Sequence, residues 1–187
     1  MPTPCFLLTP TDQASRSLRR YASPSTCPIH GYHDAVALLG IDPLLLTAEG
    51  TVASLPLLPQ DDPRWPIACA CGYRFTDTDP WQHNQKRLYQ GPDGAHYTIH
   101  PGDAPPGAMW NAPWYQDVWP GPDGQSLVVV LPSGEHWAMD TPATGGGHWT
   151  RTGTPPLLTV TPSIAASRYH GWLTAGVLSD DLEGRTY

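Results

Sequence analysis

Two short segments hold the side chains of this sequence that are best suited to bind a metal ion. Cys27 and His30 stand at C-x-x-H spacing in TCPIHGYH, and Cys69 and Cys71 stand one residue apart in ACACGYRF. Thiolates and imidazole are the ligands that close a structural zinc site tetrahedrally, and Gly72 allows backbone amides to turn toward the thiolates. The sequence therefore predicts one structural zinc bound by Cys27, His30, Cys69 and Cys71.

The spacing of these ligands leaves alternatives open. C-x-C is less usual than C-x-x-C, and 38 residues separate the two segments, so His33, His83 or Cys5 could replace one member of the set. The cysteines could also be buried free thiols, which pack as small apolar side chains. A redox pair is the weaker alternative, because a one-residue gap strains a disulfide loop and no C-x-x-C is present.

Motifs of the common enzyme classes are missing, and the sequence assigns no catalytic residue. H-E-x-x-H and G-x-S-x-G are both absent. The best enzymatic element is WQHNQ, in which His83 and Asn84 follow Asp77 and Asp79; it resembles part of the His-Asn-His nucleases, in which a histidine activates water. His170 in YHGW is another candidate, although a histidine within an alternating strand is more often a packed side chain. A metal-dependent hydrolase or nuclease using His83 and nearby carboxylates is the alternative function.

Composition sets the fold class and excludes several kinds of partner. The 187 residues include 23 Pro and 18 Gly, which favours short strands and turns over long helices. A formal charge of −7 argues against a broad nucleic-acid surface, and only residues 15–20 form a basic cluster.

No apolar run approaches the roughly 20 residues needed to cross a bilayer, and we expect no signal peptide. We expect a reducing cytoplasm, where cysteines are metal ligands or free thiols.

The chain divides into three predicted segments. Residues 1–26 form an extended Pro/Ser/Thr-rich arm, residues 27–85 a short helix plus a zinc-knuckle-like segment, and residues 86–187 an antiparallel β domain. The helix is placed at 33–41, with an apolar face ended by Gly40. In the β domain, turn sequences such as the two GPDG elements alternate with short apolar strands, and SLVVVLP has the character of a strand buried on both faces. The predicted fold is mainly β and antiparallel, with one short helix.

Five of the eight tryptophans fall between residues 110 and 149, and they either line a partner surface or fill a core that is poor in Phe. The Pro-rich segment 103–119 predicts a rigid surface loop. Within it, Trp110, Trp114 and Tyr115 are the side chains that we expect to contact a protein partner, because large aromatic rings supply contact area at low entropic cost.

Several elements together resemble a family of uncharacterised small proteins from phages of actinobacteria. The resemblance covers roughly residues 65–178; it rests on DAPPGAMW at 103–110, on the GPDG and YHGWL elements, and on a CxCG element at Cys69, Cys71 and Gly72. It implies a phage gene and no established activity, and this chain lacks the additional cysteines that family members carry before the YHG element. The expected function is that of a non-catalytic, zinc-stabilised phage protein acting through protein–protein interaction. Such a protein is virion-associated or a host-directed accessory factor, placed in the host cytoplasm or the virion.

Overall fold

The computed structural model describes residues 1–22, 27–29, 31–99, 103–142 and 146–187. The chain forms two compact units, one of residues 1–10 and 89–187 and the other of residues 11–88. The prediction of a mainly β fold is confirmed, since thirteen strands and one short 3-10 helix make up the regular structure of the described residues. Residues 1–22 of the expected arm instead supply strands to both units, and residues 23–26 lie outside the described residues.

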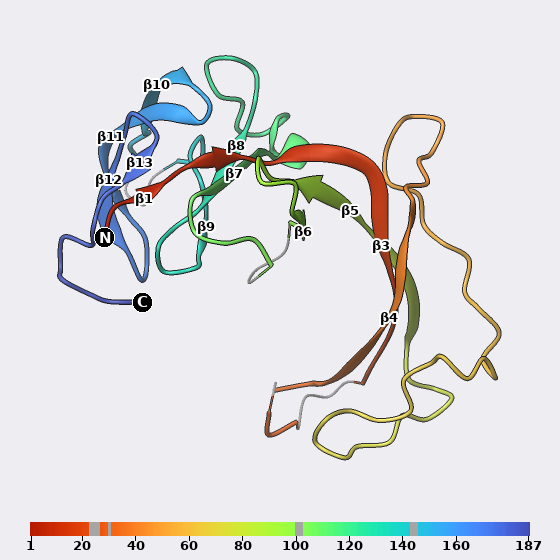
Figure 1. The fold of residues 1–187 in the computed structure, drawn as a ribbon. Helices are drawn as coiled ribbons and strands as arrows, with labels where there is room; N and C mark the ends of the chain where they lie inside the picture. Colours follow the sequence, from red (N-terminus) through yellow and green to blue (C-terminus); the bar gives the residue numbers. More distant parts are fainter. Residues whose placement is uncertain (23–26, 30, 100–102, 143–145) are drawn as a thin grey trace. The chain divides into compact units, whose positions relative to one another are not determined.

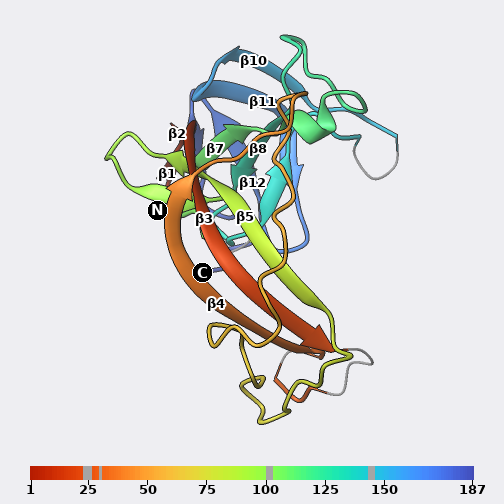
Figure 2. The same ribbon diagram turned by 90° about the vertical axis from the view of Figure 1, so that its right-hand side faces the viewer.

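Three long strands form the framework of the unit of residues 11–88: β3 (Thr9–Ala22), β4 (His33–Pro43) and β5 (Trp81–Gln90). Their sheet has the order β4-β3-β5-β6, in which β6 is the short strand His96–Thr98. β3 and β4 pair antiparallel along their length, and β4 is an edge strand. Figures 1 and 2 show β4, β3 and β5 running side by side and curving together.

The predicted helix at 33–41 is wrong, because these residues form strand β4. A nine-residue helix has little stability of its own, whereas pairing with β3 satisfies the backbone groups along the whole segment. Gly40 marks a β-bulge: Arg16 pairs with Gly40 and Ser17 pairs with Leu38, so Leu39 is the extra residue. The φ of Gly40 is +116°, a conformation that other residues rarely adopt.

The larger unit contains two sheets. The first has the order β1 (Thr3–Pro4), β13 (Val177–Leu178), β12 (His170–Thr174), β11 (Leu157–Ala165) and β10 (Thr150–Thr154). The second has the order β2 (Phe6–Leu7), β7 (Ala108–Asn111), β8 (Leu127–Val130) and β9 (His136–Ala138), and the 3-10 helix η1 (Pro113–Tyr115) follows β7. Neighbouring strands in these two sheets pair antiparallel, except for β2 and β7, which run parallel.

The core of this unit lies between its two sheets. Met109 and Val129 of the second sheet belong to one buried cluster with Leu158 and Leu173 of the first. A second cluster, which includes Trp110, covers the opposite side of β7 and β8. All four residues of β8 are buried, which confirms the prediction that SLVVVLP is covered on both faces.

Both GPDG elements form turns, as the sequence predicts. Gly94 and Gly124 have φ values of +82° and +76°, and their amides donate to Gly91 and Gly121 respectively. In the described part of the chain, no helix has the length and apolar character needed to span a bilayer.

Candidate metal centre

One cluster of ligand-type side chains gathers in the unit of residues 11–88. The ligand atoms of Cys27, His33, Cys69 and Cys71 all lie within 4.8 Å of one another. Within the cluster, His33 Nδ1 lies 3.2 Å from Cys71 Sγ, and Cys27 Sγ lies 3.8 Å from Cys69 Sγ. Cys27, His33 and Cys69 are buried and Cys71 is half-buried, so this group could hold a metal ion away from solvent.

The structure brings together all three cysteines that the sequence predicts as ligands. The fourth member of the cluster is His33, which the sequence analysis offered as a substitute. His30 lies outside the described residues. Cys5 belongs to the other unit, where it packs against the core. Among the described residues, His33 is the histidine whose ring the structure places beside the thiols.

A tight hairpin of residues 67–75 presents Cys69 and Cys71. Ala68 and Arg74 form an antiparallel bridge, and the amide of Cys69 donates to the carbonyl of Tyr73 at 2.8 Å. At the tip, the amide of Gly72 donates to the carbonyl of Cys69 at 2.9 Å, and Gly72 adopts a φ of +94°. The glycine thus closes a turn that a residue with a Cβ would strain, which agrees with the knuckle predicted from CACG.

The other two ligands flank the start of β4. The carbonyl of Cys27 accepts a hydrogen bond from the amide of Gly31 at 2.9 Å, which forms a turn immediately before the strand. His33 is the first residue of β4 and pairs with Ala22 at the end of β3. The centre therefore joins the β3–β4 connection to the 67–75 hairpin, two segments that are distant in sequence.

Backbone amides favour the thiolate form of Cys69. The amide N–H of Cys71 and then that of Asp34 donate to its sulfur and lower the pKa of Cys69 to about 6. For Cys71, the amide of Tyr73 lowers the pKa, but burial and the neighbouring thiols together raise it above its usual value. The pair therefore loses its first proton at Cys69. A thiolate is the form of cysteine that binds metal.

Aromatic side chains hold the histidine ligand in place. Tyr73 stacks on His33 with ring centroids 4.0 Å apart, and Phe75 meets Tyr73 edge-on. The hydroxyl of Tyr73 donates to Asp79 at 3.2 Å, and this carboxylate also accepts from the amide of Thr76. Sequence reasoning did not assign Tyr73 a role, although an aromatic residue directly after CACG was the available signal.

The donor set fits zinc. Zn–S bonds of about 2.3 Å in a tetrahedron place two sulfurs about 3.8 Å apart. The Cys27 and Cys69 sulfurs are separated by this distance, at 3.8 Å. Three thiols and one imidazole are soft ligands, which select zinc over magnesium or calcium. Four such ligands would complete a tetrahedron around one ion and leave no position for water, as in structural sites.

The remaining predicted residues lie apart from this centre. His83, in β5, places Nδ1 2.8 Å from the carbonyl oxygen of Pro56, and the metal-ligand cluster found among the described residues does not include it. Trp110 is buried in the core, so it is not available at the surface. Trp114 is 56% exposed, and Tyr115 is half-buried against the core. Of the three predicted partner-binding residues, Trp114 is the exposed one.

No family model matches this chain, and no significant match is found among curated proteins or among solved structures.

Proposed function

We propose that this chain is a zinc-stabilised protein that acts by binding another protein, and that its zinc has a structural role. The observation that carries the proposal is the convergence of four ligand atoms, from Cys27, His33, Cys69 and Cys71, within 4.8 Å. Because such a set leaves no open coordination position, the ion would hold the fold and would not activate water.

A bound metal ion would stabilise the long segment between β4 and β5. Residues 44–80 contain no strand, and their backbone bridges are isolated ones, Leu46 with Val52 and Ala68 with Arg74. Long connections without regular structure are uncommon in compact domains unless something else holds them. Cys69 and Cys71 lie in this segment, so a bound ion would tie it to the β3–β4 connection and offset the entropy of closing the loop.

The outer edge of β4 supports the interaction part of the proposal. Val36, Leu38 and Ile41 are 54%, 78% and 57% exposed, although they stand on the edge strand of the sheet. An edge strand with exposed apolar side chains is a template on which an extended segment of another protein can add a strand. Main-chain hydrogen bonds would provide affinity, and the apolar side chains would select the partner.

The resemblance to small actinobacteriophage proteins supports a phage origin. Within that class, the proposal is a virion-associated protein or a host-directed accessory factor. A photo-crosslinking amino acid at Leu38 tests the interaction surface in producing cells. We expect a discrete protein adduct from this position and none from Val177, a position on β13 that is 39% exposed. Equal adducts at both positions, or none at Leu38, would contradict the assignment of β4.

Chelation tests the metal part of the proposal. The zinc-loaded protein should melt at a clearly higher temperature than the same protein treated with a chelator, and added zinc should restore the original melting temperature. An unchanged melting curve after complete removal of zinc would contradict a structural role.

A further inference from the structure

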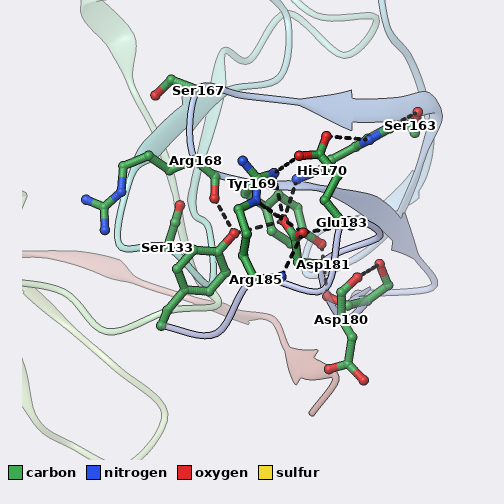
Figure 3. A network of polar contacts seen from close by, with 12 residues as sticks. Ser133, Ser163, Ser167, Arg168, Tyr169, His170, Asp180, Asp181, Glu183 and Arg185 are labelled. Carbon is green, nitrogen blue, oxygen red and sulfur yellow. Dashed lines mark hydrogen bonds and ion pairs between the residues drawn. The ribbon is translucent and has the colours of Figure 1, made fainter.

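Three polar side chains form a chain of contacts on the first sheet of the larger unit (Figure 3). Ser163 Oγ lies 3.2 Å from His170 Nε2, and His170 Nδ1 lies 3.4 Å from a carboxylate oxygen of Glu183. Ser163 comes from β11, His170 from β12, and Glu183 from the segment after β13. This order of hydroxyl, imidazole and carboxylate is the arrangement by which proteins activate a serine.

The three groups lie on the solvent side of the sheet. In β11 and β12, Ile164 and Leu173 point inward and are fully buried, whereas Ser163 and His170, at alternate positions, are half-buried. Trp172 occupies the next outward position on β12 and is 41% exposed. A reactant can therefore reach Ser163 from solvent and rest against an aromatic ring.

The backbone of His170 is fixed to the segment that carries the carboxylate. The amide of His170 donates to Asp181 at 2.9 Å, and the carbonyl of His170 accepts from the amide of Leu182 at 2.7 Å. Asp181 also accepts a hydrogen bond of 2.8 Å from the amide of Glu183 and pairs with Arg185 at 2.9 Å. Asp181 is thus a positioning residue that holds Glu183 beside the imidazole.

We propose that Ser163, His170 and Glu183 form a nucleophile, a general base and an orienting carboxylate that together hydrolyse activated carboxylic esters. This inference goes beyond the proposed function, because the site belongs to the unit that does not contain the metal-ligand cluster. In this arrangement the Glu183 carboxylate, 3.4 Å from Nδ1, would hold the proton of the imidazole on Nδ1, which leaves Nε2 to accept the hydroxyl proton of Ser163.

Each step of this reaction balances in protons and bonds. As Ser163 Oγ attacks the ester carbonyl, its proton moves to His170 Nε2 and a carbon–oxygen bond forms. The bond to the leaving alcohol then breaks, and the alcohol takes the proton from Nε2. Water attacks the acyl-serine with Nε2 as base, and the proton passes to Oγ as the carboxylic acid leaves. Ester and water become acid and alcohol, with no further reactant.

The surroundings select the class of ester. Asp181 and Glu183 are paired with Arg185, so the charges beside the histidine are largely balanced and favour a neutral substrate. The exposed ring of Trp172 offers a face for an apolar acyl or aryl group. Neutral aryl esters match both features, and their phenolate leaving groups depart without strong assistance.

Labelling with a fluorophosphonate probe tests the proposal on the full-length protein. Ser163 Oγ would bond to phosphorus, fluoride would leave, and the proton would pass through His170. We expect one label per chain at Ser163, located by peptide mass spectrometry, and turnover of p-nitrophenyl acetate by the same protein. Ser163→Ala should abolish the label. Ser167→Ala is the matched control, because Ser167 donates to Glu135 and is not part of the triad.

Two further variants distinguish a loss of serine activation from a loss of folding. His170→Gln should slow labelling by at least about 100-fold, the usual contribution of a general base. Glu183→Gln should slow it by roughly 10-fold or more, because a neutral amide orients the imidazole and stabilises its developing charge less well than a carboxylate does. Both variants should keep the wild-type melting temperature within a few degrees. If the folded wild type labels no faster than Ser163→Ala, or if His170→Gln labels at the wild-type rate, the proposal is overturned.

Discussion

Tyr73 lies flat against His33, with ring centroids 4.0 Å apart and ring planes inclined by 11°. The hydroxyl of Tyr73 is in turn held by Asp79 at 3.2 Å. The only imidazole in the metal-ligand cluster of the described residues is therefore oriented by a ring from the hairpin that also carries two of the cysteines. A neighbour that fixes the orientation of a ligand contributes to metal affinity without touching the ion.

Removing this ring should weaken zinc binding. For Tyr73→Ala we expect a loss of about 10-fold to 100-fold in zinc affinity, the range typical of groups that orient a ligand. Tyr73→Phe keeps the stacked ring and should lose much less. Competition with a chromophoric chelator measures both variants, and equal affinities for Tyr73→Ala and the wild type would contradict an orienting role.

The identity of the fourth ligand can be decided by two alanine variants. His33→Ala should reduce zinc binding strongly, because the ring of His33 lies beside the thiols. His30→Ala should leave the zinc content at one per chain if His33 is the ligand. The reverse result would restore the set predicted from the C-x-x-H spacing. Metal content per chain, measured by plasma mass spectrometry, distinguishes the two outcomes.

Loss of a thiol ligand should lower stability and zinc content together. Cys69→Ser and Cys71→Ser should each reduce the free energy of unfolding by about 3 kcal/mol or more, since zinc binding contributes directly to folding. Cys5→Ser is the control. Cys5 lies outside the cluster, and burial raises the pKa of its thiol to about 12, so it remains a neutral thiol. Zinc loss in the Cys5 variant would place the metal elsewhere.

The larger unit depends on a buried ion pair that involves no metal. The guanidinium of Arg151 donates to Asp140 at 2.8 Å, with both side chains less than a tenth exposed, and it also pairs with Asp123. Asp140 further accepts from the amide of Leu127 at 3.0 Å. Asp140→Ala should cost about 1–3 kcal/mol, because Arg151 keeps Asp123 as a partner but loses Asp140, and the amide of Leu127 loses its acceptor. Denaturant unfolding measures the loss, and the zinc content should not change.

Acid should weaken the C-terminal segment through Asp181. Hydrogen bonds from Arg185, and then from the amide of His170 and the hydroxyl of Tyr187, hold the pKa of Asp181 well below its usual range. A depressed pKa stabilises the folded state above the unfolded value of about 3.9, and this stability is lost as the pH falls further. Asp181→Asn should therefore flatten the fall in melting temperature below about pH 4. Asp180→Asn, at a 65% exposed side chain, is the control and should keep the wild-type slope.

The sequence predicted the fold class and three of the four clustered ligands, for reasons that are local. Turns such as GPDG depend on a glycine at a positive φ, and CACG makes a knuckle within a few residues. The assignment of 33–41 to a helix was wrong because several apolar side chains of β4 are exposed at the edge of the sheet. The spacing of apolar residues in this segment therefore does not show which face is buried. The fourth ligand could not be chosen, since both His30 and His33 follow Cys27 within six residues, and the place of the His33 ring beside the thiols depends on the pairing of β4 with β3.

The sequence could not predict the contacts between Ser163, His170 and Glu183, for a different reason. No nucleophile motif surrounds Ser163, and Glu183 reaches the histidine only because Asp181 folds the segment after β13 back onto β12. Such a juxtaposition depends on tertiary structure and leaves no spacing pattern. His170 itself could be singled out as a candidate, but its partners could not.

X-ray absorption at the zinc edge of the purified protein measures the ligands of the ion. We expect a first shell of three sulfurs at about 2.3 Å and one nitrogen at about 2.0 Å, with no oxygen ligand. The same spectrum from Cys71→Ser should contain one sulfur fewer. A protein that binds no zinc, or a zinc whose first shell contains water oxygen or fewer than three sulfurs, would contradict a closed structural site built from Cys27, His33, Cys69 and Cys71.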